Sequence, residues 1–234
     1  NSKAPGKKYC DYFLNKSYTD IDEILYFLKV KKFSNDGLFF TASSQISFLS
    51  LGLISKKLKK NFIDPKIIHR CIDKSKMNKF FKKIGIPIPK TKYFYGRKIT
   101  VENNKEYFLK SDYGKTPNYL YFIKNGKVPK LPKKDDFYRN CFLLQEKIIG
   151  NHFRVNYLKN KFFVFKKIND NISIPSSNLP FFDKKIKNKI KFFIKENKLK
   201  NFLIKFDIII NEKNWYVLDI GFDPPKRLEK IMIY

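Results

Sequence analysis

Two aspartates on neighbouring strand-like segments carry the clearest chemical signal in this sequence. Asp207 lies within residues 206–210 and Asp219 within residues 215–220. Both segments are rich in β-branched and aromatic residues, which favour strands, and the polar residues 211–214 between them are typical of a turn. The sequence therefore predicts a β-hairpin with one carboxylate on each strand.

The pairing register decides how the two carboxylates face each other. If Ile210 pairs with Trp215, the first aspartate lies opposite Leu218, and a slip by one residue places it opposite Asp219. In either register the carboxylates lie within roughly 5–8 Å of each other, and like charges this close destabilise a half-buried sheet unless a proton or cation separates them. Because oxygen ligands select hard ions, the pair predicts a Mg²⁺ site. The alternative is two solvated acids on an open sheet face.

The strong positive charge has a compositional explanation. The chain has 50 Lys plus Arg against 21 Asp plus Glu, a formal net charge of +29, which by itself is typical of nucleic-acid-binding proteins. Only five of the basic residues are arginine, and the accompanying excess of Lys, Asn, Ile, Phe and Tyr is what A/T-rich codons produce. The lysines are spread along the whole chain, as on a solvated surface, and no nucleic-acid-binding motif occurs. We therefore place nucleic-acid binding third among the functions considered.

The remaining composition indicates a globular protein of the cytoplasm. No apolar stretch approaches the roughly 18 residues of a membrane-spanning helix, and no signal peptide is visible. Three cysteines without a Cys-x-x-Cys pair, and only two histidines, weigh against a zinc site or a disulfide framework and fit a reducing compartment. Because the chain begins with Asn1 instead of Met, we expect a longer translation product.

Local patterns predict the elements that position the aspartates. Over residues 1–72, helical stripes alternate with a short strand at 37–41, which predicts an α/β domain with a parallel sheet. Asp73 is placed to cap the next helix and Gly85 to end it. Strand signals then dominate as far as Lys147, followed by a hairpin over 153–167 and a helix, capped by Asp183, before the acidic hairpin.

Five segments, in this order, resemble the ATP-grasp superfamily of carboxylate-amine and carboxylate-thiol ligases, which includes biotin carboxylase and D-alanine-D-alanine ligase. They are residues 4–13 with 36–41, the Asp-Lys-Ser-Lys-Met helix start at 73–77 with Gly-Ile-Pro-Ile-Pro at 85–89, the segment 107–114, the segment 144–150, and the two aspartates. The resemblance covers nearly the whole chain.

The resemblance implies an ATP-grasp fold of class α/β, in which two α+β lobes clasp a nucleotide. The expected parts are an incomplete parallel α/β N-terminal domain at 1–72, a connecting helix and segment at 73–89, a lid lobe at 90–144 and a catalytic lobe at 145–234. The implied activity is an ATP- and Mg²⁺-dependent ligase that phosphorylates a carboxylate and joins it to an amine, or less readily to a thiol. Its partners would be these small substrates, without a membrane, and a homodimer is left open.

The resemblance also assigns roles to individual residues. Phosphate and nucleotide contacts fall to Lys74, Lys110, Gly114, Gln145, Glu146 and Ile148, the last three around the adenine and ribose. Metal binding falls to Asp207, Asp219 and Asp223, and the transferring phosphate or an acidic substrate to Arg154 and Arg227.

Two departures from the family pattern leave a second function open. The metal strand usually reads Glu-x-Asn, whereas here Asp219 is followed by Ile220 and Gly221, so that one ligand has no side chain unless Asp223 replaces it. The phosphate loop usually has several glycines and here keeps only Gly114. The alternative to a ligase is therefore a non-catalytic ATP-grasp relative that binds nucleotide or a partner protein.

Overall fold

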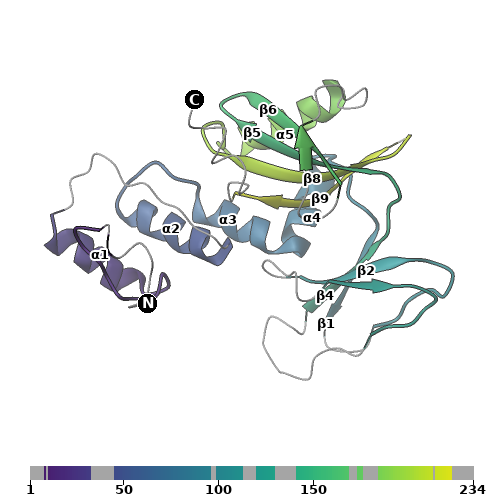
Figure 1. Ribbon diagram of the computed structural model, residues 1–234, viewed down its shortest axis with the longest axis horizontal. Helices are drawn as coiled ribbons and strands as arrows, with labels where there is room; N and C mark the ends of the chain where they lie inside the picture. The colour runs from purple at the N-terminus through teal and green to yellow at the C-terminus, as the bar shows by residue number, and fades with distance from the viewer. Residues whose placement is uncertain are drawn as a thin grey trace. The chain divides into compact units, whose positions relative to one another are not determined.

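The computed structural model describes residues 8, 10–32, 45–95, 99–112, 120–129, 141–168, 173–175, 184–212 and 214–222 of the chain (Figure 1). The chain forms two compact units, Asn1–Ile68 and His69–Tyr234. Within the described ranges, no helix has both the length and the apolar character needed to cross a membrane.

The first unit contains helices α1 (Ile21–Val30) and α2 (Gln45–Lys57) and the start of α3 (Pro65–Ile72). Its buried apolar side chains include Ile54, Ile63 and Ile68. The strand expected at 37–41 lies outside the described residues, so the parallel sheet of this region remains a prediction.

A four-stranded antiparallel sheet forms the first half of the second unit. Its strand order is β1-β4-β2-β3, with bounds β1 (Thr91–Tyr95), β2 (Tyr107–Ser111), β3 (Leu120–Ile123) and β4 (Cys141–Glu146). One face forms an apolar core that includes Leu109 and Leu144. The opposite face carries Lys110 and Gln145, because successive side chains of a strand point to opposite faces.

A five-stranded antiparallel sheet forms the second half. Its strand order is β7-β6-β5-β8-β9, with bounds β5 (Asn151–Leu158), β6 (Lys161–Lys167), β7 (Ser173–Pro175), β8 (Ile204–Ile210) and β9 (Trp215–Gly221). The hairpin β5–β6 turns at Lys159 and Asn160, as predicted. Both residues have positive φ, 45° and 66°, as the common two-residue hairpin turn requires.

Helices α4 (Lys74–Lys83) and α5 (Lys184–Glu196) complete the second unit. The predicted apolar stripe of α5 is buried, and Phe193 packs edge-on against Phe206 of β8 at 5.7 Å between ring centroids. Phe81 of α4 also packs against Phe193, at 5.5 Å. The predicted cap Asp183 lies outside the described residues.

The predicted ends of α4 are confirmed. The side chain of Asp73 accepts a hydrogen bond from the N–H of Lys76 at 2.9 Å. At the other end Gly85 has φ +69°, and the N–H of Ile86 reaches back to the carbonyl of Phe81 at 2.9 Å. This is the Schellman motif, in which a glycine with positive φ ends the helix and the next N–H bonds to the carbonyl five residues earlier.

Candidate functional site

The predicted acidic hairpin is present, with an irregularity that combines both expected registers. Ile210 pairs with Trp215, yet Asp207 pairs with Asp219, because the register shifts between Asp207 and Ile208 and leaves Leu218 as the extra residue. Directly opposed residues of an antiparallel pair have Cα atoms roughly 4.5–5.5 Å apart. The bulge therefore brings the two carboxylates together on one face of the five-stranded sheet.

Arg154 extends the acidic pair into a row of three charged residues across β5, β8 and β9. It pairs with Asp207 in the sheet, and its guanidinium makes two hydrogen bonds to that carboxylate, at 2.9 and 3.2 Å. Both side chains are largely buried, 23% and 15% exposed. A two-pronged bond of this kind fixes both groups in one geometry.

The two aspartates have opposite electrostatic surroundings. Burial acts to raise the pKa of Asp207, but the hydrogen bonds and charge of Arg154 outweigh it and hold that pKa below its ordinary value. The pKa of Asp219 is raised, chiefly by loss of hydration, with the charge of Asp207 adding to the effect. Asp219 is nevertheless exposed to solvent at the surface of the sheet. Within the described ranges of the chain, a cation is hydrogen-bonded to Asp207 but none to Asp219, so Asp219 gains more from a bound cation.

A cleft brings Asp219 together with the two lysines assigned to phosphate. Its lining comes from α3 and α4, from the four-stranded sheet and from β9: Cys71, Lys74, Met77, Asn78, Phe81, Lys110, Leu143, Gln145, Leu218, Asp219 and Ile220. Burial lowers the pKa of Lys74, and it lowers that of Lys110 to about 8, against the attraction of Asp219. Two poorly hydrated ammonium groups in one cleft favour an anionic ligand.

The four-stranded sheet presents Gln145, not Glu146, to this cleft. Gln145 is 3% exposed, and its side-chain oxygen accepts a hydrogen bond from the ammonium of Lys110 at 2.7 Å. Glu146 pairs with Tyr107, whose side chain belongs to the apolar core on the other face. The side chains of neighbouring strand residues point in opposite directions, so Glu146 can reach a ligand in the cleft only through its main chain.

The segment after β4 offers main-chain groups to a ligand. The N–H of Glu146 donates to the carbonyl of Lys90 at 2.9 Å, and that of Lys147 donates to Glu106 at 3.0 Å. Within the described parts of the chain, the main chain of Ile148 makes no such bond. Its N–H and C=O are therefore not engaged with another described backbone group.

Three assigned residues cannot be placed. Gly114, Asp223 and Arg227 lie outside the described residues, and their roles remain predictions. Among the residues that the structure does describe, no group of three or more His, Cys, Asp or Glu side chains could hold a metal ion. Asp207 and Asp219 lie opposite each other, and two carboxylates in this arrangement can bind a hard ion. Phosphate oxygens and water would then complete the coordination shell of the ion. Oxygen donors of this kind suit a hard ion such as Mg²⁺.

Sequence reasoning missed several residues of the cleft. Cys71, Met77, Asn78, Phe81 and Leu218 line it, but their sequence patterns indicate only helix and strand cores. Burial strongly raises the pKa of Cys71, which makes its thiol inert as a nucleophile. Asp112, which lies outside this lining, was given no role either, although acids are scarce in this chain and it follows Lys110 by two residues.

Comparison with known proteins gives structural matches alone. The sequence matches no protein-family model and no curated protein. The ADP complex of N5-carboxyaminoimidazole ribonucleotide synthetase is similar, with a TM-score of 0.71 at 13% identity over 97% of this chain and 63% of the other.

Two further solved structures are similar. L-amino acid ligase from Bacillus licheniformis gives a TM-score of 0.63 at 10% identity, covering 88% of this chain and 54% of that one. D-alanine–D-alanine ligase from Bacillus anthracis, complexed with ATP, gives 0.58 at 13% identity, covering 79% and 69%. The chain thus spans roughly half to two thirds of the length of these enzymes, and at such identities the likeness shows a common fold.

Proposed function

We propose, from the ATP-grasp fold of this chain, that it binds ATP with Mg²⁺ in the cleft between its two sheets and joins a carboxylate to an amine. The observation that carries the proposal is the convergence of Lys74, Lys110 and Asp219 on one cleft. Two ammonium groups suit the phosphates, and a carboxylate suits the metal that neutralises them. The neighbours named above include an ATP complex and an ADP complex, which supports a nucleotide in this place.

Each group of the cleft has a defined task in this proposal. Lys110, oriented by Gln145, and Lys74 bind phosphate oxygens, because phosphoryl transfer depends mainly on positioning and charge neutralisation. Asp219 and Asp207 hold Mg²⁺, which when bound supplies positive charge at the phosphates. The main chain around Ile148 binds the adenine edge. Arg154 orients Asp207 and lies within the same row, where its fork suits a carboxylate or phosphate of the substrate.

One observation favours a second candidate, a nucleotide-binding relative without catalysis. Position 221 is a glycine, so β9 supplies Asp219 as its sole described acid, and Asp207 is already neutralised by Arg154. A site with so few carboxylates binds metal weakly unless Asp223 contributes. Such a protein would bind ATP and release no ADP.

Thermal unfolding with ATP, with and without Mg²⁺, tests nucleotide binding. A ligand at 100 times its dissociation constant adds about 2.7 kcal/mol to the free energy of unfolding. ADP release in the presence of pooled carboxylates and amines then separates the two candidates. Stabilisation with substrate-dependent ADP release supports the ligase, and stabilisation without release supports the non-catalytic relative. An unchanged unfolding temperature contradicts both.

A further inference from the structure

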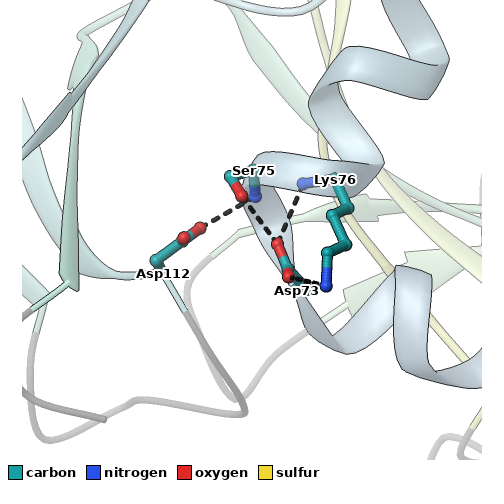
Figure 2. Close-up of polar contacts among 4 residues, drawn as sticks. All are labelled: Asp73, Ser75, Lys76 and Asp112. Carbon is teal, nitrogen blue, oxygen red and sulfur yellow. Dashed lines mark hydrogen bonds and ion pairs between the residues drawn. The ribbon is translucent and has the colours of Figure 1, made fainter. Parts of the chain in front are cut away.

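Asp112 connects the end of β2 with the first turn of α4 (Figure 2). Its side-chain Oδ1 accepts a hydrogen bond from the N–H of Ser75 at 2.8 Å. Its main-chain oxygen accepts one from the N–H of Lys74 at 2.9 Å, and its own N–H donates to Cys141 at 2.9 Å. One residue therefore satisfies the first two N–H groups of the helix while it stays bonded to the four-stranded sheet.

The third N–H of α4 is satisfied locally. Asp73 accepts from the N–H of Lys76 at 2.9 Å and from the hydroxyl of Ser75 at 2.7 Å, and it pairs with the ammonium of Lys76 at 3.0 Å (Figure 2). All of these partners lie within the same helical turn. Asp73 and Asp112 thus cap the same helix end, and of these two residues Asp112 is the one that links it to another element.

The link joins the two lysines of the cleft. Lys74 is the first residue of α4, and Lys110 precedes Asp112 by two residues on β2. After the larger effects of burial and of the Asp219 charge, the charge of Lys74 also acts to lower the pKa of Lys110, so the two ammonium groups repel each other. Asp112 is 9% exposed, and a buried carboxylate is costly unless it is well bonded. Its bonds to the two backbone segments oppose the separation of the lysines.

We infer that Asp112 is a positioning residue for the nucleotide phosphates, which holds Lys74 of α4 and Lys110 of β2 at the spacing that the phosphates require. The inference rests on the proposed function, since it concerns the same cleft. It adds a residue that touches no ligand and acts through the two lysines. Groups placed in advance bind a charged ligand more tightly than groups that must be ordered on binding.

The test compares ATP with adenosine, because adenosine lacks the phosphates. Asp112→Ala should raise the ATP dissociation constant about tenfold or more and change that of adenosine less than about twofold, as loss of hydrogen bonds to charged groups predicts. Asp112→Asn keeps an oxygen acceptor at Oδ1 and should recover most of the ATP affinity. If Asp112→Ala does not fold, Asp112→Ser, whose oxygen is too close to the backbone to reach Ser75, must give the same selective loss.

Asp73→Ala is the matched control. It also removes a carboxylate that caps α4, so it should lower the unfolding temperature, yet the ratio of adenosine to ATP dissociation constants should stay as in the wild type. An equal change of that ratio in the Asp73 and Asp112 variants, or an equal loss of ATP and adenosine binding, overturns the inference and leaves Asp112 a helix cap. Wild-type protein that binds no ATP overturns the proposed function, and the inference with it.

Discussion

Asp207 and Asp219 lie directly opposite each other although the pairs nearer the hairpin turn would have placed Leu218 there. The extra residue at this point changes which side chains share the face. Leu218, the extra residue of the bulge, lies next to Asp219, and both residues belong to the lining of the cleft. The bulge thus decides that Asp219, and not Leu218, shares a face with Asp207.

The metal assignment predicts a loss of Mg²⁺ dependence. Replacing both Asp207 and Asp219 by Asn should leave ATP binding the same in Mg²⁺ and in excess chelator, because the neutral amides no longer hold the ion. Isothermal titration of this double variant and of the wild type measures the difference. Glu196→Gln, an exposed acid at the end of α5, is the control and should behave as wild type. Equal binding of ATP by the wild type with and without chelator would show that the metal assignment is wrong.

Lys110 should contribute to ATP binding far more than an average surface lysine. Lys110→Ala should weaken binding by about 1.5–3 kcal/mol, the range for a hydrogen bond to a charged group. Lys127→Ala, in an exposed turn of the same lobe, should have almost no effect. Equal losses in the two variants would mean that overall charge, and not a site, attracts the nucleotide.

ATP affinity should fall as the pH rises through about 8, the pKa of Lys110. Above this pH the Lys110 side chain of the free protein is mostly uncharged. It must then take up a proton when the phosphates bind, which weakens binding. The limiting slope is about tenfold per pH unit. Arginine stays charged, so Lys110→Arg should show a smaller decline, due to Lys74 alone. Identical pH profiles for wild type and Lys110→Arg would contradict this assignment.

The buried charge of Lys110 should lower the free energy of unfolding at neutral pH. Its pKa in the folded protein, about 8, lies below its ordinary value of 10.5, so the unfolded chain binds more protons between these limits. The cost is present in full below pH 8 and disappears as the pH approaches 10.5. Lys110→Met should therefore unfold at higher urea concentration than wild type at pH 7, with a difference that shrinks by pH 10. A difference that grows with pH would refute this account.

The pair of Arg154 and Asp207 should contribute to stability. Arg154→Ala leaves a largely buried carboxylate without its two hydrogen bonds and should lower the free energy of unfolding by about 1.5–3 kcal/mol. Arg154→Lys should recover only part of this, because an ammonium cannot make two parallel bonds. A double-mutant cycle with Asp207→Asn isolates the pair. A coupling energy near zero would show that the contact seen here adds nothing.

Local sequence signals predicted the elements well. The turn at Lys159 and Asn160, the end of α4 at Gly85 and its cap at Asp73 follow from residues a few positions apart, because turn and cap geometry depend on short-range hydrogen bonds and on φ. The acidic hairpin was also predicted, since its two strands are adjacent in sequence. What local signals could not select was its register, because a bulge costs little locally and is settled by the packing of both strands.

Tertiary structure decided which residues meet. Arg154 and Asp207 are 53 positions apart in the sequence, and they meet because β5 pairs with β8. Asp112 reaches α4 across 37 positions. The side chain of Gln145, and not that of Glu146, points to the cleft because of the way in which β4 turns its two faces. The sequence of a strand shows which side chains share a face. Which of the two faces lines the cleft depends on long-range strand pairing and burial, so these determine the site.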